Sequence, residues 1–237
     1  MDYYDILIDG ISAEIYVSRI IHTRSWIAAE LSDGRYGIAL HDKLQSRERM
    51  FPTLEGLTAR KAAEAARSWN LLEASEAMAV INAFYNTEER LDKLSARCGF
   101  GKSCTQGFST EGKKIALIGH LVLQPDALKG ASEVYIIERD PKPGDYPDSA
   151  CEYMLPDCDI VIMTASAAIN KTLPRLLELS KNAVSIIIGP TTPLCPELKA
   201  LGIDRLSGMV VRDKAAFEAW ATANHGSPYK HGDVFMI

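Results

Sequence analysis

The chain has 237 residues and a formal net charge of −5, with 47% hydrophobic and 24% charged residues. This length accommodates one large domain or two modest ones, and the composition is that of a globular protein with a sizeable core. Charge is spread evenly: residues 1–110 hold 13 Lys/Arg and 15 Asp/Glu, and residues 111–237 hold 13 and 16. These totals reveal no basic surface, so we do not expect a nucleic-acid partner.

Neither a membrane span nor a signal peptide is evident in the sequence. No apolar run approaches the ~20 residues of a membrane span, and the acidic start Met1–Asp5 lacks the basic region of a signal peptide. We therefore expect a cytoplasmic protein without a membrane partner.

The five cysteines are Cys98, Cys104, Cys151, Cys158 and Cys195. Their spacing fits no zinc pattern, and their number is odd. Reduced thiols are the expected state in a cytosolic protein. A thiol pair of Cys98 and Cys104 in a loop is the alternative.

The first part of the chain predicts a helix, a three-stranded meander and two further helices. The first helix is expected over Tyr4–Ile11. The second hairpin turns at Asp33-Gly34, a pair that accepts the positive φ of tight turns. Thr58 is suited to cap a helix over Ala59–Trp69. The predicted strands are Ile15–Ile21, Trp26–Leu31 and Tyr36–Leu40.

The helix predicted over Leu71–Tyr85 is apolar on two flanks, with a narrow polar stripe between them. A helix of this pattern is largely buried. Asn82 belongs to the polar stripe, so it needs hydrogen-bond partners from a neighbouring element, a water or a ligand.

Residues 91–112 are predicted to form a linker, because the sequence there is charged and then rich in Gly and Ser, without periodicity. The linker would join an N-terminal domain of residues 1–90 to a C-terminal domain of residues 113–237. Ala96–Ser103 loosely fits a phosphate-binding loop. A nucleotide-triphosphatase site is not expected there, since no buried strand precedes the stretch and no good helix follows it.

Beyond the linker, short apolar strands alternate with helix-length segments. This alternation is typical of a parallel sheet covered on both faces. The chain is expected to close with a helix over Lys214–Ala223. The predicted strands are Lys114–His120, Glu133–Glu138, Asp159–Thr164, Ala183–Gly189 and Arg205–Val211.

Open α/β sheets bind ligands at the carboxyl ends of their strands. The first strand ends in Gly119-His120 without G-x-G-x-x-G, so a standard dinucleotide site is not expected. His120 is the one histidine predicted to face this crevice, as a base or a ligand. Glu138 ends the second strand, where an acid can bond the ribose hydroxyls of an adenosine-type ligand or simply be solvated.

Hydroxyl and amide groups follow the third and fourth strands. Pro174 belongs in the first turn of a helix, which makes Thr172 its predicted cap. Such groups near a helix start suit an anion or a carboxylate. The acid-rich turn Asp140–Asp148 is stiffened by prolines, as a rigid crossover or as a lid over the site. The predicted ligand-binding residues are Asn82, Gly119, Thr164, Ser166, Asn170, Gly189, Pro190, Thr191 and Thr192.

Several stretches together resemble one known family. They are Ala79–Ala83, Gly119-His120, Glu138–Asp145, Leu155–Asp159, Thr164 with Asn170–Leu173, and Gly189–Pro193. The set resembles the uncharacterised bacterial and archaeal family of putative heavy-metal chelation proteins over nearly the whole chain. Where the family has Gly after the third-strand Thr, this chain has Ala165.

The resemblance implies an α/β fold in which a small α+β enolase N-terminal-like domain is followed by a Rossmann-like parallel-sheet domain similar to methyltransferases. It also implies an interdomain site. Matched by position, this site would take His120, Glu138, Thr164, Asn170, Thr191 and Asn82.

Three functions remain open at this point. The first is an enzyme that condenses or hydrolyses a polar or anionic small molecule, such as a pterin-, flavin- or metallophore-like compound. In it, His120 or Glu138 would move protons, while Asn82 and Asn170 orient the substrate. The second is a non-catalytic carrier of a metal or metal chelate, held by His120 with Glu138 or a cysteine.

The third is an adenosine-type cofactor binder that uses Glu138. The cofactor thus stays open between a transition metal and an adenosine-type molecule. Besides the small-molecule ligand, we expect a homodimer as a reasonable partner, through an exposed apolar face of the N-terminal meander.

Overall fold

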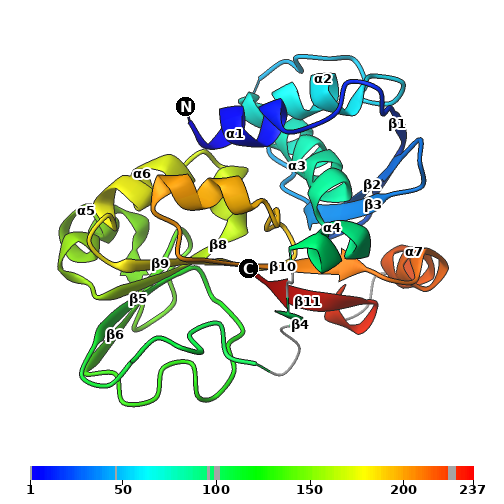
Figure 1. Ribbon diagram of the computed structural model, residues 1–237. Helices are drawn as coiled ribbons and strands as arrows, with labels where there is room; N and C mark the ends of the chain where they lie inside the picture. The colour runs from blue at the N-terminus through cyan, green and yellow to red at the C-terminus, as the bar shows by residue number, and fades with distance from the viewer. Residues whose placement is uncertain (1, 46, 95–96, 99–101, 224–227) are drawn as a thin grey trace.

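Two sheets organise the protein (Figure 1). The computed structural model describes residues 2–45, 47–94, 97–98, 102–223 and 228–237. The N-terminal half holds a three-stranded antiparallel sheet, and the C-terminal half holds most of an eight-stranded, mostly parallel sheet. The predicted α/β fold with a small and a large unit is therefore confirmed.

The N-terminal unit starts with α1 (Tyr3–Asp9), which a capping box between Asp2 and Asp5 initiates. A meander follows, with β1 (Val17–His22), β2 (Trp26–Leu31) and β3 (Tyr36–Leu40). The predicted Asp-Gly turn joins the last two strands, and Gly34 supplies the positive φ, 83°, that the turn requires.

The predicted helix over Ala59–Trp69 forms in two pieces. Thr58 caps α2 (Ala59–Ala63) by accepting from the Lys61 N–H, as predicted, and the chain then tightens into the 3₁₀ helix η1 (Glu64–Arg67). The 3₁₀ helix ends at Arg67. Three residues later, the side chain of Asn70 caps the next helix, α3 (Leu71–Tyr85), by accepting from the Glu73 N–H.

The helix α3 is the buried centre of the N-terminal unit, as its two apolar flanks predict. It packs directly on β3 at Gly37, where a Cβ atom would lie 2.0 Å from the backbone nitrogen of Ala83. The absence of a side chain at Gly37 lets helix and strand backbones meet. The short helix α4 (Glu88–Lys93), capped by Thr87, follows α3 in the chain.

Part of the predicted linker belongs to the large sheet. Within residues 91–112, β4 (Arg97–Cys98) pairs with β11 (Gly232–Met236). Farther along, the guanidinium of Arg205 donates to the carbonyl oxygens of Cys104 and Gln106 at 2.6 and 2.7 Å. Half of the phosphate-loop-like stretch, and the side chain of Cys98 with its suggested thiol pair, lie outside the described residues.

The strands of the large sheet lie in the order β4-β11-β10-β9-β8-β5-β6-β7, and β11 runs antiparallel to both of its neighbours, β10 and β4. Counted along the chain, the five long parallel strands have the order 2-1-3-4-5 of a doubly wound sheet, with the switch point between β5 and β8. The parallel strands are β5 (Lys114–Ile118), β6 (Glu133–Glu138), β7 (Tyr146–Pro147), β8 (Ile160–Thr164), β9 (Val184–Ile188) and β10 (Arg205–Val211).

The large sheet is covered on both faces, as predicted, but only one cover is helical. Figure 1 shows α5 (Cys151–Met154) and α6 (Leu173–Leu179) above the sheet, with the green loops of residues 102–132 below it. The lower cover places Phe108, Leu121 and Leu123 against alternate strand residues. Pro125 and Gly130 interrupt the β5–β6 crossover, which explains the absence of a regular helix there.

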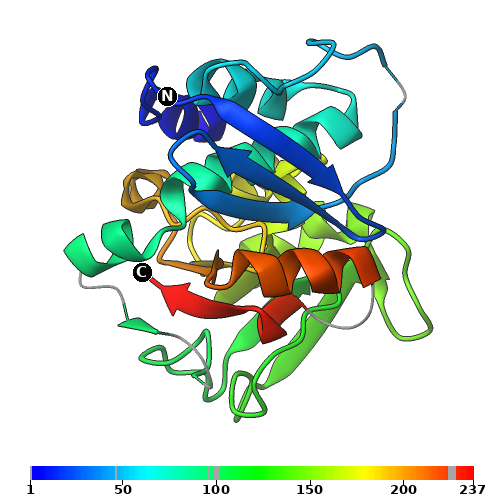
Figure 2. The ribbon, with the colours of Figure 1, turned by 90° about the vertical axis from the view of Figure 1, so that its right-hand side faces the viewer.

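The last helix, α7 (Lys214–Ala223), leaves the large sheet and packs against the small one (Figure 2). Phe217 lies edge-on to Tyr36 of β3 at 5.8 Å, and Lys214 pairs with Glu30 of β2 at 3.2 Å. The part of the meander formed by Ala28, Tyr36 and Ile38 is therefore covered within the same chain, and the homodimer stays a prediction. No helix in the described part of the chain has the length and apolarity needed to cross a membrane.

Candidate functional site

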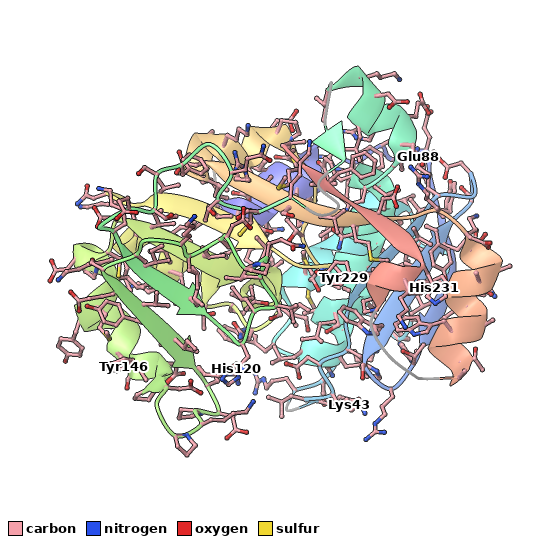
Figure 3. The ribbon with its side chains drawn as sticks, turned by 90° about the horizontal axis from the view of Figure 1, so that it is seen from below. Lys43, Glu88, His120, Tyr146, Tyr229 and His231 are labelled. Carbon is pink, nitrogen blue, oxygen red and sulfur yellow. The ribbon has the colours of Figure 1, made fainter. Side chains whose placement is uncertain are left out.

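His120 is held between two carboxylates at the carboxyl edge of the large sheet. Its Nε2 lies 2.8 Å from Oδ2 of Asp145, and its Nδ1 lies 3.3 Å from Oε2 of Glu138. The imidazole is 34% exposed, whereas the Asp145 side chain is only 8% exposed. The ring is therefore partly open to solvent while the acid that contacts it is covered, and Figure 3 shows His120 at the edge of the molecule.

The backbone at the end of β5 explains this placement. Gly119 adopts a φ of 96°, and a Cβ atom there would lie 3.3 Å from Cγ2 of Thr164. The turn brings the N–H of His120 to Glu138, whose Oε2 accepts it at 3.1 Å. The other oxygen of Glu138 accepts from the N–H of Arg139 at 2.8 Å. Both oxygens of Glu138 thus hold backbone in place.

Asp145 reaches His120 through a tight turn. The Lys142 N–H donates to Oδ2 of Asp145 at 2.7 Å, while the Asp145 N–H donates to the Lys142 carbonyl at 2.9 Å. The chain then pairs with β6 as β7. Residues 140–148 thus lead from the end of β6 into β7, which pairs back on β6. The N–H of Lys142 and the ring of His120 hold the pKa of Asp145 below its usual range.

The loop after β8 presents hydroxyls beside Gly119. Thr164 caps the 3₁₀ helix η4 (Ala165–Ala168), and its Oγ1 lies 2.8 Å from the hydroxyl of Ser166. Oδ1 of Asn170 accepts from both the N–H and the hydroxyl of Thr172. Thr172 precedes α6 as predicted, but its side chain makes no capping bond, because its hydroxyl is committed to Asn170.

Lys171 was not singled out by the sequence reasoning. It is the one non-glycine residue with a positive φ, 70°, in the described part of the chain. Its Nζ donates to the Ile169 carbonyl at 2.7 Å, and burial lowers its pKa to about 8, partly offset by Asp42. The Asn-Lys-Thr turn between η4 and α6 was the one sequence feature that could have indicated this lysine. Its burial depends on the N-terminal unit, where the ring of Tyr4 lies 5.7 Å from Nζ.

The N-terminal unit reaches the same edge through the end of β3. The Leu40 N–H donates to the hydroxyl of Thr191, after β9, at 2.9 Å. Next, the ring of His41 stacks on His22 with centroids 5.6 Å apart. Figure 3 shows Lys43 and His120 at the same edge of the molecule, one from each unit.

The two stacked histidines are each anchored at one ring nitrogen. Nδ1 of His41 donates to the Thr23 carbonyl, and Nε2 of His22 lies 2.8 Å from Oε1 of the buried Glu76. Burial lowers the pKa of His41. A neutral His41 at pH 7 follows, with Nε2 available as an acceptor.

Another group of the predicted residues forms an interior seam between the units. Asn82 is fully buried, and its Nδ2 donates to the carbonyls of Ile38 at 2.7 Å and Pro190 at 3.4 Å. Thr191 and Thr192 are also buried, next to Gly189, which has a φ of 119°. Oδ1 of Asn82 and Oγ1 of Thr192 have no hydrogen-bond partner among the described residues. Neither side chain is open to solvent.

The predicted residues thus divide into two groups. We call the first the carboxyl-edge site. It comprises Gly119, His120, Glu138, Thr164, Ser166 and Asn170, joined by Asp145 and Lys171, which sequence reasoning did not assign. The second is the seam of Asn82, Gly189, Pro190, Thr191 and Thr192.

Among the described residues, the donor groups do not fit a resident metal ion. Within the described ranges, no three His, Cys, Asp or Glu side chains converge as metal ligands. Cys104, Cys151, Cys158 and Cys195 are buried free thiols. Burial raises the pKa of Cys104, Cys151 and Cys158 to about 11, so they are protonated at neutral pH, whereas metals bind thiolates.

Two family models match the chain, DUF4213 over residues 4–85 and DUF364 over residues 108–233, and both are described as putative heavy-metal chelation. The second match spans 126 of the 237 residues. The chain belongs to the DUF364 family. The predicted family is therefore confirmed.

Solved DUF364 structures of unknown function have the same fold. The one from Desulfitobacterium hafniense is 32% identical, with a TM-score of 0.83 over 99% of this chain and 96% of that one. The one from Pyrococcus horikoshii, 22% identical with a TM-score of 0.80 over 99% and 98%, supports the fold alone. An uncharacterised protein of Methanocaldococcus jannaschii is 29% identical over 158 residues, 62% of this chain and 58% of that protein.

Proposed function

We propose that this DUF364 protein binds a polar or anionic small molecule at the carboxyl-edge site and transforms it by acid–base catalysis. The observation that carries the proposal is the partly exposed imidazole of His120, fixed at Nε2 by the covered carboxylate of Asp145. A carboxylate in this position selects the ring tautomer and stabilises the imidazolium that forms during proton transfer.

Nδ1 of His120 is the nitrogen that would exchange a proton with the substrate. It lies 3.3 Å from Glu138, without the alignment of a hydrogen bond, so a substrate group can replace that contact. Glu138 already accepts two backbone N–H groups, which favours a positioning role for this acid.

The remaining groups of the site suit a substrate with oxygen atoms. The hydroxyls of Thr164 and Ser166 and the amide of Asn170 offer hydrogen bonds. Lys171, with a pKa of about 8, can form an ion pair with an anionic substrate when it is protonated, or transfer a second proton near neutral pH. Condensation and hydrolysis both need such an acid and base.

A metallophore-, pterin- or flavin-like compound is the ligand class we propose. The family is described as putative heavy-metal chelation, but the described side chains do not fit a metal ion bound by the protein. Both observations agree if the product of the reaction is a chelator, because the small molecule would then hold the ion. A metal carrier is less well supported because the described side chains do not fit a metal ion. An adenosine-type cofactor is less well supported because backbone groups already occupy Glu138.

The test combines a ligand screen with two variants. Thermal-shift screening of the wild type against pterins, flavins and catechol or hydroxamate chelators should find a stabilising ligand, since binding to the native state raises stability. Turnover of that compound should fall about 10²- to 10⁴-fold in His120→Ala and strongly in Asp145→Asn, with the fold intact.

His231→Ala is the matched control, because this imidazole lies beside Trp220, far from the carboxyl edge. Its turnover should equal that of the wild type. Unchanged turnover in His120→Ala would contradict the proposal. A stoichiometric transition metal that is lost in His120→Ala would favour the carrier instead.

A further inference from the structure

A cavity of about 560 Å³ lies apart from the carboxyl-edge site, at the opposite end of α3. It is open to solvent on one side and is lined by residues of α1, the last turn of α3, α4 and the 3₁₀ helix η5 (Pro196–Leu201). None of the residues that line the cavity belongs to the carboxyl-edge site. The volume is in the range of small-molecule sites.

Arg90 is the cation of this cavity. Its guanidinium lies 5.0 Å from the ring centroids of both Phe84 and Tyr85. Its Nε is buried without a hydrogen-bond partner in the described part of the chain, and Glu88, an acid on the same helix, pairs with Arg212 instead. A guanidinium fork held on two aromatic rings is prepared for a carboxylate.

Two acids line the same cavity. Asp9 pairs with Arg60 at 2.6 Å, on the surface, while Glu197 accepts from the thiol of Cys195 at 3.1 Å and pairs with no described cation. A dianion would be repelled by these carboxylates, so a phosphate ester fits poorly. A ligand that brings both an anion and a cation matches the charges.

The rest of the lining is mostly apolar. Ile6 of α1 and Leu201 of η5 face the cavity, and Tyr85 is fixed by its hydroxyl, which donates to the Leu7 carbonyl at 2.9 Å. An apolar body between the two charged groups of a ligand would bury its surface here.

We propose that this cavity binds a small zwitterion, an apolar α-amino acid or dipeptide. The ligand's carboxylate pairs with the guanidinium of Arg90, and its ammonium group pairs with the carboxylate of Glu197. Its apolar side chain packs on Ile6 and Leu201. This site is independent of the function proposed for the carboxyl edge.

Calorimetric titration with leucine and leucyl-leucine tests the proposal, with leucinamide and 4-methylpentanoate as probes that each lack one charge. At least one zwitterion should bind the wild type with a Kd below about 1 mM. Both single-charge probes should bind at least about tenfold more weakly, and Arg90→Met should weaken the zwitterion about 10- to 100-fold, the equivalent of one charge-assisted hydrogen bond.

Lys93→Met removes one positive charge from the same helix at an exposed position and should bind like the wild type, as should His120→Ala. Glu197→Gln keeps the shape of the side chain, so it tests the site if Arg90→Met fails to fold, and should also weaken binding. No binding heat from either zwitterion, or equal affinities of leucine and 4-methylpentanoate, would overturn the proposal.

Discussion

The positions of His120 and Lys171 at the carboxyl edge both depend on a residue with a positive φ. Gly119, with its φ of 96°, turns the chain so that His120 meets Glu138, and Lys171 itself adopts a φ of 70°. Such a conformation costs a non-glycine residue about 1 kcal/mol or more, so surrounding contacts must hold it. At Lys171, these contacts come from the carbonyl of Ile169 and from burial against the N-terminal unit.

Lys171→Met is expected to change how stability depends on pH. The folded pKa of Lys171, about 8, lies below its usual value of 10.5, so between these two pH values the unfolded chain binds more protons than the native one. Wild-type stability therefore gains a contribution as pH rises through this window, on the order of 1–2 kcal/mol after allowance for partial exposure.

Urea unfolding at pH 7 and pH 10.5 measures this effect. The variant, which lacks the titrating group, should be the more stable protein at pH 7, and its advantage should shrink at pH 10.5. All other titrating groups are common to both proteins and cancel in the difference. A difference that does not vary with pH would show that the native lysine titrates normally.

At the scale of elements, α3 is the helix that connects the small sheet of its own unit to the large unit. Gly37 brings its backbone against β3, and Asn82 and Asn86 bond it to the segment after β9. Asn86 donates from Nδ2 to the carbonyls of Thr192 at 2.9 Å and Met209 at 3.2 Å, and its Oδ1 accepts from the Leu194 N–H at 2.8 Å. One side chain thus joins the end of α3 to two parts of the large unit.

Asn86→Ala should lower the free energy of unfolding by about 2–4 kcal/mol, because it leaves the Leu194 N–H and two carbonyls without this partner in a buried place. Asn182→Ala, in an exposed turn, is the matched control and should change it by less than about 0.5 kcal/mol. Chemical denaturation gives both values. Equal effects of the two substitutions would mean that the seam contributes little to stability.

At the scale of the whole molecule, the two units share one interior. A single cluster of buried apolar residues runs from Leu7 in α1 through Met78 in α3 to Met163 in β8 and Cys195. The Tyr4 hydroxyl donates to the Ala168 carbonyl at 2.6 Å, and α7 of the large unit covers the small sheet. Either unit alone would expose much of this interior.

We therefore expect the chain to unfold in one cooperative thermal transition. Differential scanning calorimetry should give a calorimetric enthalpy equal to the van't Hoff enthalpy. Two resolved transitions, or independent folding of residues 102–237, would contradict the shared core.

Local patterns in the sequence were sufficient for much of the fold. The bounds of α3, β6, β10 and α7 follow from periodicity and capping alone, because each signal spans only neighbouring residues. The placement of His120 at a strand end follows from the same reasoning. The short strands β4 and β7 were missed, since a two-residue strand has no periodicity and exists only through its partner. The prediction that the helix over Lys214–Ala223 closes the chain is wrong, because β11 follows it and pairs with β10.

The sequence by itself determined the α/β class, the long elements and the edge at which polar groups gather, since these depend on hydrophobic pattern and turn chemistry. Tertiary structure decided which predicted residues remain accessible. Asn82 and Thr192 were expected at the ligand but are closed inside the seam, while Asp145 and Lys171 gained their roles from a folded crossover and a neighbouring unit. Burial and the approach of distant segments are properties of the packed chain, which no local window contains.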